Sequence, residues 1–193
     1  KAQLKGFENA ILELKDHPAL LMWAVGNEVD LFYTNFKVWQ AVEDIAAMIK
    51  RLDPNHPTMT VTAGIDVAEV NMIKEFCPSI DVLGINTYGG IGPLADQIRK
   101  FGWKKPYMVT EWGPYGHWES PLTSWGVSVE ANSSQKAKMR KDSYIHIQKD
   151  SKQCLGSYCF LWGHKQEQTP TWYGIFTEDG KGTESIDVLN SYW

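Results

Sequence analysis

The 193-residue sequence is poor in cysteine, and its three cysteines are Cys77, Cys154 and Cys159. Their spacing matches no zinc-binding or thiol-redox motif. We interpret all three as small buried residues, with one disulfide as the alternative. The cellular compartment stays open, with a secreted or periplasmic location favoured over a cytoplasmic one.

The sequence also lacks an excess of basic residues. It carries 19 lysines and arginines against 23 acidic residues, for a net charge of −4, and the basic residues are scattered. This distribution argues against a nucleic-acid partner. No apolar run approaches the roughly 18 residues that a membrane span needs, so we expect no membrane-spanning segment.

Aromatic residues are abundant: nine tryptophans, eight tyrosines and seven phenylalanines. Several lie in polar, glycine-rich and proline-rich stretches, "EWGPYGHWESPLTSW" and "WGHKQEQTPTWYG", rather than in apolar runs. One interpretation is that they cover the edges of a core. The other is that they form the walls of a cleft that stacks on a flat, CH-rich ligand such as a sugar or a nucleobase.

Helical periodicity alternates with short apolar runs along the chain. The helical pattern covers residues 4–14, 38–52, 66–76, 93–102, 184–193 and a segment that Ser133 or Ser134 caps. The apolar runs predict strands over residues 19–26, 58–63, 80–88, 106–112 and 156–162. A helix followed by five strands, each followed by a helix, predicts a single α/β domain over residues 1–193 with a parallel sheet.

Two architectures fit this order, an open doubly wound sheet and a closed eight-stranded barrel. No glycine-rich phosphate loop follows the first predicted strand, which counts against the nucleotide-binding form of the open sheet. Both architectures place active groups at the carboxyl ends of the strands.

The predicted strand ends carry two carboxylates and large aromatics. They read Asn27-Glu28, Asn86-Thr87-Tyr88, Glu111-Trp112 and Trp162-Gly163. Side-chain alternation puts Glu28, Tyr88 and Glu111 on the side of their strands that faces a common axis. We therefore expect these three side chains to converge.

Two carboxyl groups, one protonated and one ionised, form the acid and nucleophile that cleave a glycosidic bond. Metal binding is the competing use, but it recruits further ligands, and no other strand end offers Asp, Glu or His. We expect no metal and no cofactor. His117 and His164, in the flanking loops, are interpreted as substrate contacts or surface residues.

Four segments, "HPALLMWAVGNE", "DVLGINTYGG", "KPYMVTEWG" and "GSYCFLWG", resemble the fourth, sixth, seventh and eighth strands of the clan A glycoside hydrolases. The sequence is most similar to the catalytic barrel domain of family 2. The resemblance implies a (β/α)8 barrel of which this chain holds the C-terminal five βα units. The first three units are then expected in the same parent chain, and the alternative is that two copies of this chain assemble to close the gap.

The resemblance also implies roles for individual residues. Glu28 would be the acid/base and Glu111 the nucleophile, about 5–5.5 Å apart as in retaining enzymes. Asn27 would bind the sugar 2-hydroxyl, Tyr88 would hydrogen-bond Glu111, and Trp162 would lie beneath the sugar. The other tryptophans predicted to contact substrate are Trp112, Trp118 and Trp172.

The predicted function is a retaining glycoside hydrolase that cleaves a β-linked glycoside, oligosaccharide or polysaccharide by double displacement. A transglycosylase would use the same site with a sugar hydroxyl in place of water. Two other classes stay open: a non-catalytic carbohydrate-binding domain or pseudoenzyme, and a metal-dependent barrel hydrolase.

Overall fold

The computed structural model describes residues 2–193, which form two compact units. The first unit comprises residues up to Asn86 together with Asp96–Met108, and the second comprises Thr87–Ala95 and Val109–Trp193. Each unit is described by itself below.

Five parallel strands follow one another in the sheet in chain order. They are β1 (Trp23–Ala24), β2 (Thr58–Ala63), β3 (Val82–Asn86), β4 (Tyr107–Trp112) and β5 (Cys154–Cys159). This order confirms the predicted α/β fold and is the arrangement of a partial (β/α)8 barrel.

Helices precede, separate and follow the strands, as predicted. They are α1 (Ala2–Leu14), α2 (Lys37–Leu52), α3 (Val67–Phe76), α4 (Ile91–Lys100), α5 (Ser133–Lys149) and α6 (Glu184–Tyr192). The prediction that a serine caps α5 is wrong by one residue, because the cap is Asn132. Its side chain accepts from the Gln135 amide while the Gln135 side chain accepts from the Asn132 amide.

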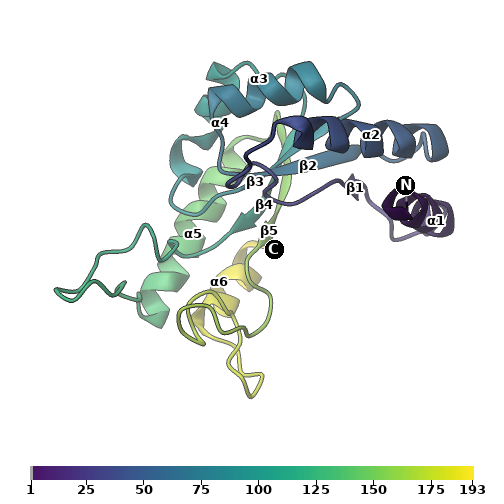
Figure 1. Ribbon diagram of the computed structural model, residues 1–193. Coiled ribbons are helices and arrows are strands. Elements are labelled where there is room, and N and C mark those ends of the chain that lie inside the picture. Colours follow the sequence, from purple (N-terminus) through teal and green to yellow (C-terminus); the bar gives the residue numbers. More distant parts are fainter. Residues whose placement is uncertain (1) are drawn as a thin grey trace. The chain divides into compact units, whose positions relative to one another are not determined.

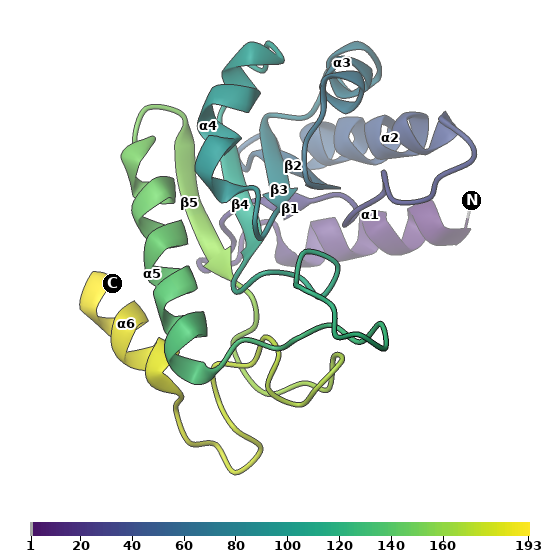
Figure 2. The same ribbon diagram turned by 90° about the vertical axis from the view of Figure 1, so that its left-hand side faces the viewer.

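The core of the first unit lies around β2 and β3. Every residue of β3 and all but the last of β2 are buried, which is typical of parallel strands covered on both faces. Helix α2 contributes a buried stripe that includes Trp39, Val42 and Ala46. It packs against β2, α1 and α3, and α1 runs beside it in Figures 1 and 2.

Strand β1 is much shorter than the predicted run of residues 19–26. It lies at the edge of the sheet and pairs only with β2, and Leu21 just before it is 59% exposed. The chain then turns at Gly26, whose φ of +79° lies in the left-handed region that glycine favours. Because regular alternation ends there, it does not determine where Glu28 points.

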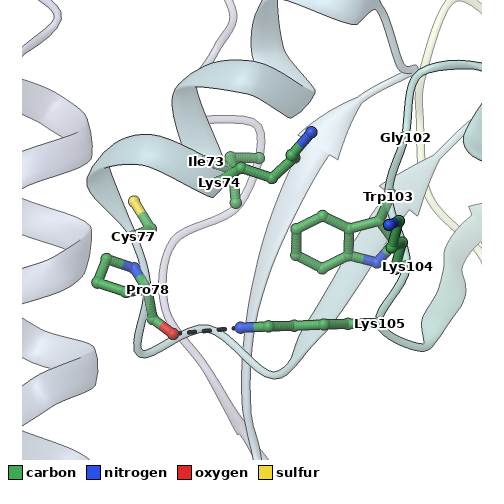
Figure 3. A pocket seen from close by; sticks show the side chains of 8 residues that line it. All are labelled: Ile73, Lys74, Cys77, Pro78, Gly102, Trp103, Lys104 and Lys105. Carbon is green, nitrogen blue, oxygen red and sulfur yellow. Dashed lines mark hydrogen bonds between the residues drawn. The ribbon is translucent and has the colours of Figure 1, made fainter.

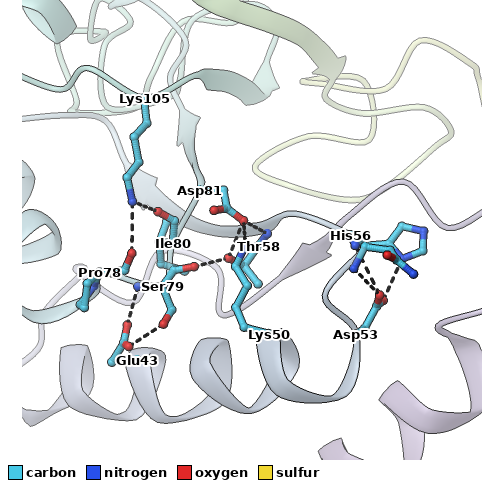
Figure 4. Close-up of polar contacts among 11 residues, drawn as sticks. Glu43, Lys50, Asp53, His56, Thr58, Pro78, Ser79, Ile80, Asp81 and Lys105 are labelled. Atoms are coloured by element: carbon cyan, nitrogen blue, oxygen red, sulfur yellow. Dashed lines mark hydrogen bonds and ion pairs between the residues drawn. The ribbon is translucent and has the colours of Figure 1, made fainter.

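A polar network joins the segments that precede β2 and β3 in the first unit (Figure 4). The buried Asp53 accepts hydrogen bonds from the Trp23 indole at 2.8 Å and from the His56 ring at 2.8 Å. Asp81 accepts from the Thr58 amide at 2.9 Å and pairs with Lys50. Burial raises the pKa of both aspartates, but these hydrogen bonds outweigh it and hold each pKa below its usual value.

The second unit packs α5 against β5 and α6. Its two long loops, residues 113–132 and 160–183, gather at the end toward which β5 points (Figure 2). The fully buried Arg140 of α5 donates to Ser185 Oγ at 2.9 Å and to the carbonyl oxygen of Tyr173. A buried guanidinium needs such partners, and here they attach the second loop to α5 and α6.

Strand β5 ends three residues before the predicted end at Trp162. The Phe160 amide still bonds the Trp112 carbonyl of β4, at 2.8 Å. The Leu161 amide bonds the Tyr173 carbonyl instead, at 3.3 Å. The chain therefore leaves β4 at Phe160 and pairs with its own loop.

None of the cysteines in residues 2–193 forms a disulfide. Cys77 is buried as predicted, and burial raises the pKa of its thiol to about 12. Cys154 and Cys159 are partly exposed, so the prediction of burial is wrong for these two.

Over the same residues, the structure contains no helix with both the length and the apolar character to cross a membrane.

Candidate active site

In the first unit, an asparagine on β3 joins the two residues at the predicted first strand end. The Nδ2 atom of Asn86 donates to Glu28 Oε1 at 2.9 Å and to Asn27 Oδ1 at 3.1 Å. Asn86 is 3% exposed, whereas Asn27 is exposed and Glu28 half-buried. A buried amide thus orients a carboxylate that a ligand can reach.

The backbone at Glu28 is left-handed, with a φ of 50°. This conformation is uncommon for a residue with a side chain and persists where the surroundings hold it. The Glu28 amide donates to the Val61 carbonyl at 2.9 Å, and Asn86 holds the side chain. These two contacts fix the direction of the Glu28 carboxylate.

Two acids, Asp30 and Glu69, stabilise the turn that follows Glu28. The Asp30 carboxylate accepts from the Ala63 amide at 3.0 and 3.1 Å and hydrogen-bonds the Glu69 carboxyl group. Burial, and then the charges of Asp30 and Asp66, raise the pKa of Glu69 to about 7. Glu69 is therefore protonated in acid and donates its proton to Asp30.

This pair predicts a pH dependence of stability. The native state binds a proton on Glu69 up to about pH 7, whereas an unfolded glutamate releases it near its ordinary pKa of 4.5. The stabilisation is complete below pH 4.5 and is lost as the pH rises through 7. We expect the free energy of unfolding, measured by urea titration, to fall by about 2 kcal/mol over this window.

Glu69→Gln should remove most of this slope, because glutamine cannot lose a proton and can still donate to Asp30. Glu75→Gln is the matched control, since Glu75 is an exposed acid on the same helix. An unchanged slope in the Glu69 variant would contradict the assignment.

In the second unit, Tyr88 and Glu111 meet. The Tyr88 hydroxyl donates to Glu111 Oε2 at 2.8 Å, and the Thr87 amide donates to the Glu111 carbonyl at 2.9 Å. Tyr88 is 8% exposed, and burial followed by the Glu111 charge raises the pKa of its phenol far above the usual value. The phenol thus stays protonated and remains a donor to the carboxylate.

Aromatic rings surround Tyr88 on several sides. Trp118 and Phe160 meet it edge to face, with centroids at 5.8 and 6.2 Å, and Tyr173 lies tilted at 5.3 Å. The prediction missed Phe160, because it placed the end of the last strand at Trp162. It also missed Asn86, although Asn86 is the first residue of a strand end that was recognised.

Trp162 lies elsewhere in the second unit. It is 62% exposed, stacks on Trp193 at 6.2 Å and meets Phe176 edge to face at 5.4 Å. Phe160, the residue directly after β5, contacts Tyr88, whereas Trp162 stacks on Trp193. The role of Trp162 beneath a sugar stays a prediction.

Two tryptophans predicted to contact substrate are packed inside the second unit. Trp112 is fully buried and stacks on Tyr144 of α5 at 5.7 Å. Trp172 is 3% exposed, and its indole donates to the Tyr115 carbonyl at 3.0 Å. Both rings are covered by other residues of the second unit, and their role as substrate contacts stays a prediction.

The two histidines of the loops, His117 and His164, differ in their surroundings. His117 meets Trp118 edge to face at 4.9 Å and Trp172 at 6.4 Å, so it packs within the aromatic group. His164 is exposed.

A pocket of about 290 Å³ in the first unit lies between the end of α3 and the segment before β4 (Figure 3). Trp103, Ile73 and Cys77 line it together with three lysines, and Lys105 donates to the Pro78 carbonyl at 3.2 Å. It adjoins the amino ends of β3 and β4. The end of the strands opposite to this pocket carries Glu28.

The described residues, 2–193, bring no three His, Cys, Asp or Glu side chains together in an arrangement that holds a metal ion.

Parallel strands that follow one another in chain order and alternate with helices define a class, the βα-barrel folds. The family model "Glycosyl hydrolases family 2, TIM barrel domain" matches residues 1–146. The chain therefore belongs to glycosyl hydrolase family 2, as the sequence predicts.

Solved structures show the same fold at low identity. A β-D-glucuronidase from Dictyoglomus thermophilum superposes with a TM-score of 0.71 and 18% identity, over 98% of this chain and 35% of its own. A family 2 β-galacturonidase from Eisenbergiella tayi gives 0.71 and 18%, over 98% and 36%. A family 128 endo-β-1,3-glucanase from Pseudomonas viridiflava gives 0.72 and 15%, over 97% and 74%.

The chain thus spans about a third of the length of the glucuronidase and galacturonidase chains. Among curated proteins, no sequence matches this chain.

Proposed function

We propose that this chain carries the catalytic carboxylates of a retaining glycoside hydrolase that cleaves a β-linked glycoside. The contact that supports this most directly is the hydrogen bond from Tyr88 to Glu111, 2.8 Å long. It orients the carboxylate and favours its ionised form, which is the form that attacks an anomeric carbon.

In the first step, Glu111 attacks the anomeric carbon while Glu28 donates its proton to the leaving oxygen. The bond to the leaving group breaks, the leaving group departs as an alcohol, and an ester between sugar and Glu111 forms. In the second step Glu28 removes a proton from water, the water oxygen displaces Glu111, and the product keeps its anomeric configuration. A sugar hydroxyl in place of water would give transglycosylation.

The remaining residues bind the sugar. Asn27 is exposed beside Glu28 and shares the Asn86 amide with it, so its own amide is available to a sugar hydroxyl. Trp118 is 62% exposed beside Tyr88 and offers a flat face for stacking. We assign Asn27 and Trp118 as substrate contacts, with a β-linked oligosaccharide, polysaccharide or simple glycoside as the substrate.

The β-D-glucuronidase and the β-galacturonidase are much longer than this chain. We propose that this chain works with further βα units of a barrel in the same parent protein. Assays should therefore include both the 193-residue chain and that longer protein.

Trapping the covalent intermediate tests this function. A panel of 2-deoxy-2-fluoro-β-glycosides with a good leaving group should label the protein with one sugar, because fluorine slows the second step more than the first when the leaving group is activated. Peptide mass spectrometry should find the sugar on Glu111. A label on another carboxylate, or hydrolysis that inverts the anomeric configuration in ¹H NMR, would contradict the proposal.

A further inference from the structure

Glu119, in the second unit, has no part in the proposed reaction and does not lie in the core. Glu119 follows Trp118 in the loop after β4, and its carboxylate binds two backbone amides from different segments. It accepts from the Gly89 amide, with 3.1 Å to each oxygen, and from the Gly116 amide at 2.8 Å. Since Gly89 follows Tyr88 directly, Glu119 connects the Trp118 turn to the residue next to Tyr88.

Both glycines are needed for this arrangement. A Cβ atom on Gly89 would lie 2.7 Å from Glu119 Oε1, and one on Gly116 would lie 2.5 Å from the Trp118 ring. Neither residue has a left-handed backbone, so the reason for glycine here is space rather than conformation. The carboxylate and the indole occupy the positions that side chains would fill.

The Trp118 ring is thus held at several points. It lies over Gly116 and meets both Tyr88 and His117 edge to face. The Glu119 amide also closes the turn by donating to the Gly116 carbonyl at 2.9 Å. Even so, 62% of the Trp118 side chain stays exposed, which is unusual for an indole fixed at this many points.

We propose that Glu119 is a positioning residue that holds Trp118 beside the Tyr88–Glu111 pair as a stacking surface for a pyranose ring of the substrate. This inference rests on the proposed glycosidase function. A fixed ring binds a sugar better than a mobile one, because its ordering does not oppose binding. Glu119 itself touches no substrate and acts through Trp118.

The first test needs no substrate. In protein labelled with 5-fluorotryptophan, the ¹⁹F resonance of Trp118 is identified by its absence in Trp118→Phe. Glu119→Ala should broaden or shift this resonance. Gly89→Ala should do the same, because the added methyl group displaces the carboxylate. Gly92→Ala is the matched control, since a Cβ there meets nothing within 4 Å.

The second test is a double-mutant cycle on a 4-nitrophenyl β-glycoside that the protein hydrolyses. Glu119→Ala should raise KM about fivefold and leave kcat nearly unchanged, because the stacking contact is equal in ground and transition states. In a Trp118→Ala background, Glu119→Ala should add almost nothing. Glu119→Gln, which keeps one acceptor oxygen, should lie between wild type and Glu119→Ala.

An unchanged Trp118 resonance in both Glu119→Ala and Gly89→Ala would overturn the proposal. So would additive effects in the cycle. If the wild-type protein hydrolyses no glycoside, the proposed function is wrong, but the role of Glu119 is still open to test. Calorimetric binding of methyl β-glycosides to the same variants then decides whether Glu119 positions a sugar-binding ring.

Discussion

Replacing Glu111 with alanine is expected to lower kcat for an aryl β-glycoside on the order of 10⁴-fold, while KM changes little. The variant lacks the oxygen that bonds to the sugar in the proposed mechanism, so no glycosyl-enzyme should form. Tyr88 then has no carboxylate to bond, but its ring stays packed between Trp118 and Phe160. The fold should therefore persist, with a far-ultraviolet circular dichroism spectrum like that of wild type.

Azide distinguishes a lost nucleophile from a damaged site. In Glu111→Ala the anion occupies the space left by the carboxylate and attacks the anomeric carbon directly. The expected product is the α-glycosyl azide, with inverted configuration. Glu178→Ala serves as the control and should keep full activity, because Glu178 is an exposed acid in the loop of residues 160–183.

Three results would contradict this assignment. Undiminished turnover by Glu111→Ala removes the nucleophile role. Saturable sugar binding by wild type without any turnover leaves a non-catalytic carbohydrate-binding domain as the function. Loss of wild-type turnover with a chelator would instead indicate the metal-dependent class.

Replacing Glu28 with alanine should give a loss that depends on the leaving group. For an alkyl β-glycoside, whose leaving oxygen needs a proton, we expect kcat/KM to fall about 10³-fold. For a 2,4-dinitrophenyl β-glycoside, whose leaving group departs without a proton, kcat/KM should fall by less than about tenfold. The second step still lacks its base, so kcat for the activated substrate should fall strongly.

Azide also tests the role of Glu28, and the expected product has the anomeric configuration opposite to that from Glu111→Ala. In Glu28→Ala it replaces water in the second step, accelerates turnover of the activated substrate and gives the β-glycosyl azide. Glu28→Gln is the isosteric comparison, since an amide oxygen can still accept from Asn86 while it has no proton to transfer. An equal loss for both leaving groups would show that Glu28 positions the substrate rather than moving a proton.

Much of the fold could be predicted from sequence because its signals are local. Helix α2 has apolar residues at helical spacing, and β2 and β3 are continuous apolar runs, as full burial requires. The errors occur where long-range pairing decides the ends. Strand β1 is short because it has a neighbour on one side only, and β5 ends early because Leu161 pairs with Tyr173.

The candidate site likewise contains residues that a local pattern marks and residues that only long-range contacts define. Glu28, Tyr88 and Glu111 could be proposed as site residues because each lies at the end of a recognisable apolar run. Asn86 and Glu119 act through hydrogen bonds to residues distant in sequence, and no local pattern marks such contacts. The burial of Trp112 and Trp172 could not be predicted, because composition does not reveal which face of an aromatic residue is covered.

The setting of Tyr88 has an evolutionary consequence. Its hydroxyl reaches Glu111, while its ring touches Phe160, Trp118 and Tyr173, which come from two loops of variable sequence length in barrel proteins. Substitutions among those apolar neighbours alter how strongly the phenol donates to the carboxylate. Under the proposed function, natural drift or laboratory selection in these loops would thereby retune the reactivity and acidity optimum of the site without changing either acid.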